Sequence, residues 1–181
     1  MACHVAGGLC LANDPKDDVV FDGARATDVI EAPQGFDTDA LLMMGALARS
    51  CEMAGALEAM LDISVTYSQD RVAFERPISK FQAVQHNLAR LAGEVAAAVC
   101  AASSAADALQ RAGAFDEEVF FEIAAAKIRV GEAAGEGAAI AHQVHGAIGF
   151  TMEHILQRYS RRVWAWRDEF GSESTWAVRL G

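Results

Sequence analysis

Apolar side chains recur every three or four residues along most of this chain, which is the spacing of one face of an α-helix. Four stretches show this spacing, and their predicted bounds are 38 to about 69, 80 to about 111, 116 to about 145, and 152 to about 170. At 1.5 Å per residue, the first stretch would span about 45 Å as a helix. The pattern therefore predicts four helices, most of them long.

Residues that cap helices stand at the ends of these stretches. Ser, Thr and Asp side chains accept hydrogen bonds from the free N–H groups of a first turn, and a Gln three residues later completes a capping box. The candidate N-caps are Asp37 or Thr38, Ser79 with Gln82, Asp116, and Thr151. Gly171 is predicted to end the fourth helix. The connections between helices are therefore short.

Short connections place successive helices antiparallel, so the predicted fold is all-α, an up-down-up-down four-helix bundle. Alanine and glycine dominate stretches such as EVAAAVCAASSAADA and EAAGEGAAIA, and Trp164, Trp166 and Trp176 cluster near the C-terminus. Small residues allow helices to approach closely, but they leave wide apolar surfaces. We expect these surfaces and the tryptophans to contact another subunit.

The first 35 residues break the helical pattern. The stretch DDVVFDGARATDVIEAP alternates weakly, with a β-rich VVF run, a turn-prone Asp22-Gly23 and then Pro33. We expect a strand pair or the tail of a β region here. A pair of strands is marginally stable alone, so this segment has to pack against something. The predicted organisation is a tail, residues 1–35, followed by a helical bundle domain, residues 36–181.

Composition and charge narrow the function classes. The chain has 181 residues, 52% of them hydrophobic, and a formal net charge of −10. An acidic total argues against nucleic-acid binding, because phosphate contacts need a basic face. There is no uninterrupted apolar run of 18 residues and no secretory signal, so we expect a cytoplasmic protein without a membrane segment. Basic residues gather at 71–90 and 158–167, where a phosphorylated small molecule could be held.

Common metal and catalytic motifs are missing from the sequence. Di-iron bundles use Glu-x-x-His pairs, but no glutamate here has a histidine three residues later. His142 and His145 share a helix face without a carboxylate pair, and the cysteines show no C-x-x-C spacing. G-x-S-x-G, Walker and G-x-G-x-x-G motifs are also absent. We therefore predict no metal site.

Two local motifs remain as candidate sites. Residues 71–82 read RVAFERPISKFQ, a cationic break followed by an aromatic ring and an amide at a new helix start. An arginine beside a helix N-terminus can bind an anion. Residues 143–151 read QVHGAIGFT, a polar helix end whose glycines let a ligand approach the backbone. On the residues alone, an ordinary capped turn is the favoured interpretation of each.

Together, the two motifs resemble a pair of family signatures. The stretch YSQDRVAFERPISKFQAVQHNLA resembles the R-x-x-F-G-x-P-I-x-x-F-Q-x-x-Q signature of acyl-CoA dehydrogenases, and AIAHQVHGAIGFTMEHILQRYSRR resembles their Q-x-H-G-G-x-G-[FY]-[ST] signature. Order, spacing and helical context match over about residues 37–176. Both signatures belong to the C-terminal helical domain of that family, and the tail resembles the end of its β domain.

The resemblance implies a flavoprotein that uses FAD to dehydrogenate an acyl-CoA thioester between Cα and Cβ. Bundles of this family form dimers and tetramers, with FAD lying across the dimer interface. The residues implied to bind the cofactor are Arg71 at the pyrophosphate, Phe74 and Gln82 on the adenine side, Gln143 and Gly146 completing that half-site, and Ser172 near the flavin. The implied partner is a second copy of this chain or a fuller acyl-CoA dehydrogenase subunit.

The sequence departs from the family pattern where the chemistry occurs. Glu75 replaces the glycine of R-x-x-F-G, and Ala147 replaces the second glycine of G-G. Phe170 and Gly45 occupy the two positions at which the family places its catalytic glutamate, and neither can take a proton. Glu169 is the fallback if the register slips by one residue.

We therefore expect no catalytic base in this chain and no activity from it alone. The chain is then either a truncated dehydrogenase or a subunit that works beside a fuller partner. The alternative is a helical interaction module without a cofactor, in which the alanine seams and arginine clusters serve oligomerisation alone.

Overall fold

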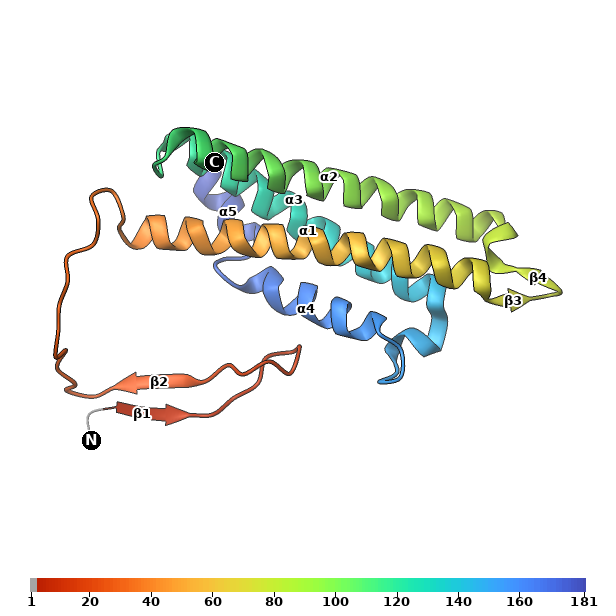
Figure 1. Cartoon of the computed structure of the whole chain (residues 1–181), viewed down its shortest axis with the longest axis horizontal. Coiled ribbons are helices and arrows are strands. Elements are labelled where there is room, and N and C mark those ends of the chain that lie inside the picture. The colour runs from red at the N-terminus through yellow and green to blue at the C-terminus, as the bar shows by residue number, and fades with distance from the viewer. Residues whose placement is uncertain (1–2) are drawn as a thin grey trace.

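The computed structural model describes residues 3–181 and confirms the all-α bundle. Three long helices and a fourth of 13 residues alternate in direction, and a short fifth helix follows them (Figure 1). Their bounds are α1 Thr38–Asp70, α2 Gln82–Ala112, α3 Glu117–His145, α4 Leu156–Asp168 and α5 Glu173–Leu180. The 3-10 turns η1, Ile78–Lys80, and η2, Gly146–Phe150, lie between helices.

Two of the predicted caps are confirmed and two are wrong. The side chain of Asp37 accepts a hydrogen bond from Ala40 N at 2.9 Å, and that of Asp116 accepts one from Val119 N at 2.9 Å. Ser79 instead lies inside η1, so α2 begins later without a side-chain cap. Thr151 Oγ1 donates back to Ile148 O, and α4 begins only at Leu156.

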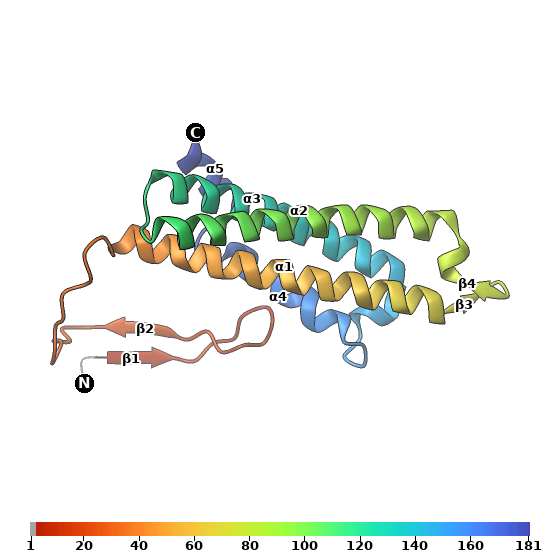
Figure 2. The ribbon, with the colours of Figure 1, turned by 45° about the horizontal axis from the view of Figure 1, so that its top comes forward.

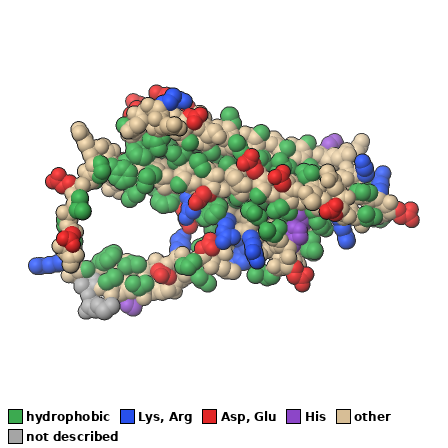
Figure 3. Space-filling model, in the orientation of Figure 1, with side chains coloured by type: hydrophobic (Ala, Val, Ile, Leu, Met, Phe, Trp, Pro, Cys, Tyr) green, Lys and Arg blue, Asp and Glu red, His purple; other side chains and the backbone are tan. Residues whose placement is uncertain are grey.

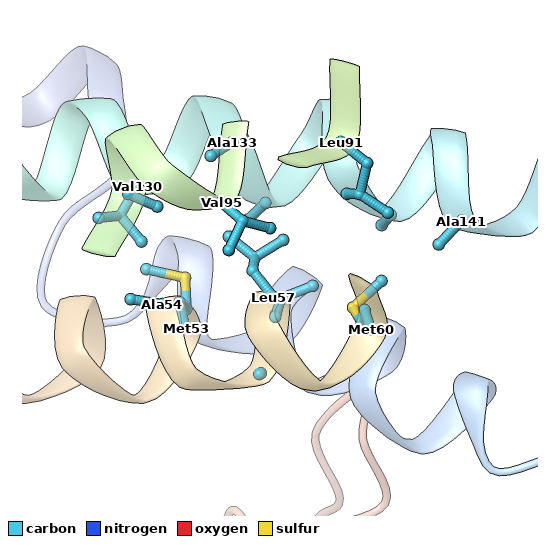
Figure 4. Close-up of a cluster of buried hydrophobic side chains, with 14 of the residues drawn as sticks. Met53, Ala54, Leu57, Met60, Leu91, Val95, Val130, Ala133 and Ala141 are labelled. Carbon is cyan, nitrogen blue, oxygen red and sulfur yellow. The ribbon is translucent and has the colours of Figure 1, made fainter. Parts of the chain in front are cut away.

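Helix α3 is the centre of the bundle and contacts every other helix. The main core lies between α1, α2 and α3, where Met53, Leu57 and Met60 face Leu91 and Val95 (Figure 4). Many of the remaining core positions are alanines, which let the helices approach closely. The core therefore combines a few large side chains with many small ones.

Trp176 corrects one expectation about the surface. It is fully buried in a second core cluster beside Ile123, and its Nε1 donates to Phe170 O at 2.9 Å. Trp164 and Trp166 are half-buried and pack against the main core. The bundle itself therefore accounts for the buried surface of Trp176, and this residue offers no contact to another subunit.

The N-terminal residues form an arm that stands apart from the helices (Figures 1 and 2). Strands β1, Cys3–Ala6, and β2, Asp18–Phe21, pair antiparallel, which confirms the expected strand pair. Asp22-Gly23 follows β2 and does not join two strands. Figure 3 shows an opening between arm and bundle. Arg161 of α4 contacts the arm by donating to Leu11 O and to Asn13 Oδ1 at 2.7 and 2.8 Å.

Two helices expose more apolar surface than a buried core requires. By length and composition, α1 and α2 are each apolar enough to cross a membrane, and core helices of globular proteins pass the same test. In the most apolar 18-residue stretch of each helix, the buried share is 44% for α1 and only 28% for α2. The outer face of α2 is therefore an apolar surface that this single chain leaves uncovered.

Candidate functional site

The first candidate motif forms a hairpin at one end of the bundle. Strands β3, Val72–Ala73, and β4, Arg76–Pro77, pair antiparallel directly after α1 (Figure 1). Arg71 ends α1, with its N–H donating to Tyr67 O at 2.9 Å. Its guanidinium is exposed and makes no ion pair within residues 3–181. Arg71 is thus available to an anion.

Phe74 and Glu75 form the two-residue turn of this hairpin. Their φ angles are +51° and +66°, the left-handed conformation that such turns require at both central positions. Glycine adopts it freely, whereas a side chain strains it. Backbone conformation therefore explains the glycine that the family signature places at position 75, and Glu75 adds both strain and a negative charge to the turn.

Two aromatic rings lie at this hairpin, Phe74 in its turn and Phe81 at the start of α2. Phe74 is 89% exposed and meets the edge of Phe81 at 6.2 Å between centroids. The Arg76 guanidinium lies over the Phe81 ring at 4.2 Å. Gln82 begins α2 and is exposed. An exposed ring, an amide and cations thus gather at one helix junction.

The second motif lies where α3 ends. Gly146 has φ +67° and ψ −148°, a conformation open essentially to glycine alone, and a Cβ there would meet only open space. Gln143 and Gly146 are exposed and line a pocket of about 310 Å³ with Ala139, His142, Phe150 and Trp164. Backbone and amide are therefore accessible to a ligand.

His142 is a member of this pocket that sequence reasoning missed. Its ring is stacked with Phe150 at 3.9 Å and with Trp164 at 5.6 Å. Nε2 is paired with Ser160 Oγ at 2.9 Å, while the buried Nδ1 has no partner within residues 3–181. Burial lowers the pKa of His142, and neighbouring His145 lowers it further. The position directly before Gln143 was the only signal available in the sequence.

Tyr67 and His145 join the two motifs at the same end of the bundle. The ring of Tyr67 near the end of α1 is stacked on His145 at 4.4 Å, and its hydroxyl donates to His145 O at 3.3 Å. The structure therefore places Arg71, Phe74 and Gln82 at one corner of this end and Gln143 and Gly146 at another. Within residues 3–181, the pocket beside Gln143 and Gly146 is not lined by any residue of the first group.

The remaining predicted residues lie toward the other end of the bundle. Gly45 is 26 residues before Arg71 on α1, which corresponds to about 39 Å along the helix. Phe170 lies so close to Gly45 that a Cβ there would overlap its ring. Ser172 caps α5, accepting from Thr175 N at 3.4 Å. The two positions that the family reserves for a base are therefore in mutual contact.

Glu169, the fallback base, is engaged in an ion pair. Its Oε2 accepts a hydrogen bond from Arg49 Nε at 2.7 Å, and Arg49 is also paired with Glu52. The Arg49 guanidinium lies 5.3 Å from the Trp166 ring centroid. Two guanidinium nitrogens of Arg49 thus hold the Glu169 carboxylate against α1. Among residues 3–181 no three His, Cys, Asp or Glu side chains gather as a metal site would require.

Comparison with known proteins identifies the family. The family model described as acyl-CoA dehydrogenase, C-terminal domain, matches residues 35–173. The acyl-CoA dehydrogenase IpdE2 of Mycolicibacterium smegmatis is 37% identical over 145 residues, covering 76% of this chain and 40% of that protein. IpdE2 of Mycobacterium tuberculosis is 35% identical over 126 residues, covering 70% and 35%.

Solved structures show the same fold. Glutaryl-CoA dehydrogenase from Mycobacterium smegmatis matches with a TM-score of 0.85 at 22% identity, over 99% of this chain and 47% of that one. The ChsE4-ChsE5 complex from Mycobacterium tuberculosis matches with 0.80 at 24% identity, over 99% and 48%. The chain thus spans less than half the length of each of these four proteins. It belongs to the acyl-CoA dehydrogenase family, of which it carries the C-terminal helical domain.

Proposed function

We propose that this chain is the FAD-binding and oligomerisation domain of an enzyme that dehydrogenates an acyl-CoA thioester. The observation that carries the proposal is the distance between two groups of implied site residues. Gly45, which contacts Phe170 near Ser172, lies about 39 Å along α1 from Arg71. Groups so far apart serve two different sites. Each site then takes one group from this chain and the rest from a neighbouring subunit.

The residues at the α1 and α3 end fit a dinucleotide. Arg71, which has no ion-pair partner among the described residues, is a cation for the pyrophosphate, while Phe74 and Gln82 offer a ring face and an amide to the adenine side. Gly146 opens the backbone beside Gln143, next to a pocket with an unpartnered His142 nitrogen. FAD, when bound, accepts the hydride from the substrate.

In this proposal the proton is removed by another chain. A general base has to lie within hydrogen-bond reach of the proton that it takes. Phe170 and Gly45 carry no titratable group, and Glu169 is paired with Arg49. The partner is therefore a fuller subunit that supplies the carboxylate and the surfaces covering the acyl-CoA. A second copy of this chain would complete a cofactor site without a base.

A cofactor-free interaction module is the second candidate. Glu75 favours it, because its carboxylate adds negative charge to the hairpin that follows the guanidinium proposed to meet the pyrophosphate. A flavin absorbance spectrum separates the two functions. Purified protein that is yellow, or becomes so with FAD and a partner, supports the half-site, whereas protein that stays colourless under both conditions supports the module.

Replacement of Arg71 by Ala tests the assignment within the assembled protein. We expect the FAD dissociation constant to rise at least tenfold, because a charge-assisted hydrogen bond contributes about 1.5–3 kcal/mol. Arg90→Ala is the matched control, since Arg90 is exposed and paired with Glu136 away from the motif. Equal FAD affinity in the wild type and Arg71→Ala would contradict the assignment.

A further inference from the structure

Lys127 is a buried charge for which the proposed function has no use. It lies in the middle of α3 within the apolar stretch EIAAAKIRV and is 0% exposed. Burial of an ammonium group is unfavourable unless partners compensate for the lost water. A methionine of similar length would fill this position without that penalty, so the charge needs a specific explanation.

The partners of Lys127 lie in the turn between α4 and α5. Its Nζ donates to Arg167 O at 2.6 Å and to Gly171 O at 2.8 Å. The carbonyl between them, Phe170 O, accepts from Trp176 Nε1. Side chains from α3 and α5 therefore hold three carbonyls of one short segment.

This turn does not hold its shape by local preference. Phe170 and Gly171 have φ angles of +54° and +93°, and a left-handed non-glycine residue persists only where its surroundings impose it. Burial lowers the pKa of Lys127 to about 8, although Glu173, Asp168 and Glu169 oppose this effect and Arg167 adds to it. The amine is thus mostly protonated at neutral pH, with enough N–H donors for both carbonyls.

We propose that Lys127 is a positioning residue that fixes the α4–α5 turn from α3. Through this turn it keeps the Phe170 ring over Gly45 and holds Ser172 at the start of α5. The part that concerns Ser172 rests on the proposed function, because the family resemblance implies that this residue lies near the flavin of a bound FAD. The part that concerns the turn stands on the hydrogen bonds alone.

Hydrogen exchange measured by mass spectrometry tests the turn in the full-length chain. In Lys127→Met we expect peptides covering 168–176 to exchange at least tenfold faster, with protection of α1 and α2 unchanged, because local opening exposes only the turn. Val130→Ala is the control, since Val130 is a buried α3 residue of the main core. It should lower protection across the bundle. Unchanged exchange in 168–176, or a uniform increase in Lys127→Met, would overturn the proposal.

A double-mutant cycle on FAD affinity tests the link to Ser172. Lys127→Met and Ser172→Ala should each weaken FAD binding in the assembled protein, and the double variant should be no weaker than the worse single one, because both act through one contact. Additive effects would refute that link. If the wild type binds no FAD with any partner, the proposed function fails while the exchange experiment still decides the role of Lys127.

Discussion

At the residue scale, Glu75 affects both the backbone conformation of its turn and the charge near Arg71, and two different substitutions separate these effects. The side chain strains a left-handed turn residue, and its carboxylate repels the anion that Arg71 is proposed to bind. Glu75→Gly should raise the free energy of unfolding by about 1 kcal/mol and strengthen FAD retention.

Denaturant titration and FAD dissociation constants measure the two effects. Glu75→Gln is the matched variant, because it keeps the strain but removes the charge. We expect it to strengthen FAD binding at unchanged stability. Equal stability of the Gly and Gln variants would contradict the backbone argument.

The two buried histidines, His142 and His145, predict that the protein becomes less stable as the pH falls. Burial lowers the pKa of both His142 and His145 below the value of about 6.5 that an unfolded chain has. As pH falls below about 6.5, the unfolded chain binds protons that the folded chain rejects. The free energy of unfolding therefore decreases between pH 7.5 and 5.5.

Unfolding titrations at several pH values in this range measure the decrease. His142→Phe should make the dependence shallower, because the ring can keep its stack with Phe150 and Trp164 without a titrating group. His86 is exposed, so His86→Phe should leave the dependence unchanged. A pH dependence that persists in full in His142→Phe would assign it to other groups.

At the element scale, the junction between α3 and η2 depends on one glycine. Gly146 stands at φ +67° and ψ −148°, where a side chain costs about 1–3 kcal/mol. Gly146→Ala should therefore destabilise the protein by about that amount and weaken FAD retention through the same turn.

A second Gly→Ala change provides the opposite expectation. Gly55 lies inside α1, and a Cβ there would meet nothing within 4 Å. Gly55→Ala should stabilise the protein by up to about 1 kcal/mol, because alanine loses less backbone entropy in a helix. Thermal and denaturant unfolding of both variants would measure the contrast. Changes in the free energy of unfolding with the same sign in both variants would refute the conformational argument.

At the scale of the whole molecule, the outer face of α2 predicts self-association. Only 28% of its most apolar stretch is buried within the chain. We expect the isolated protein to be at least a dimer in sedimentation experiments at tens of micromolar. Ala96→Glu places a charge on this exposed face and should raise the monomer fraction strongly, because a buried unpaired charge is unfavourable.

Ser174→Glu is the control, since Ser174 is exposed on α5. It should sediment like the wild type. A monodisperse 19.3 kDa monomer for the wild type would contradict the apolar-surface argument. A dimer that Ala96→Glu leaves intact would show that the interface is not the outer face of α2.

Local signals in the sequence determined the helices and most of their ends. Apolar periodicity located the four long helices, and Asp37 and Asp116 cap because a short carboxylate reaches N–H groups three residues away. The two signature motifs located the candidate residues, because each motif is a set of residue types at fixed spacing along the chain. None of this required a distant contact.

The tertiary structure decided what depends on residues far apart in sequence. Ser79 and Thr151 failed as caps because neighbouring 3-10 turns took their positions. Phe170 packs on Gly45, and Lys127 Nζ donates to Gly171 O, and each of these contacts joins residues more than 40 positions apart. Periodicity records which face of a helix is apolar, but not which neighbour covers it, because that depends on how the helices pack.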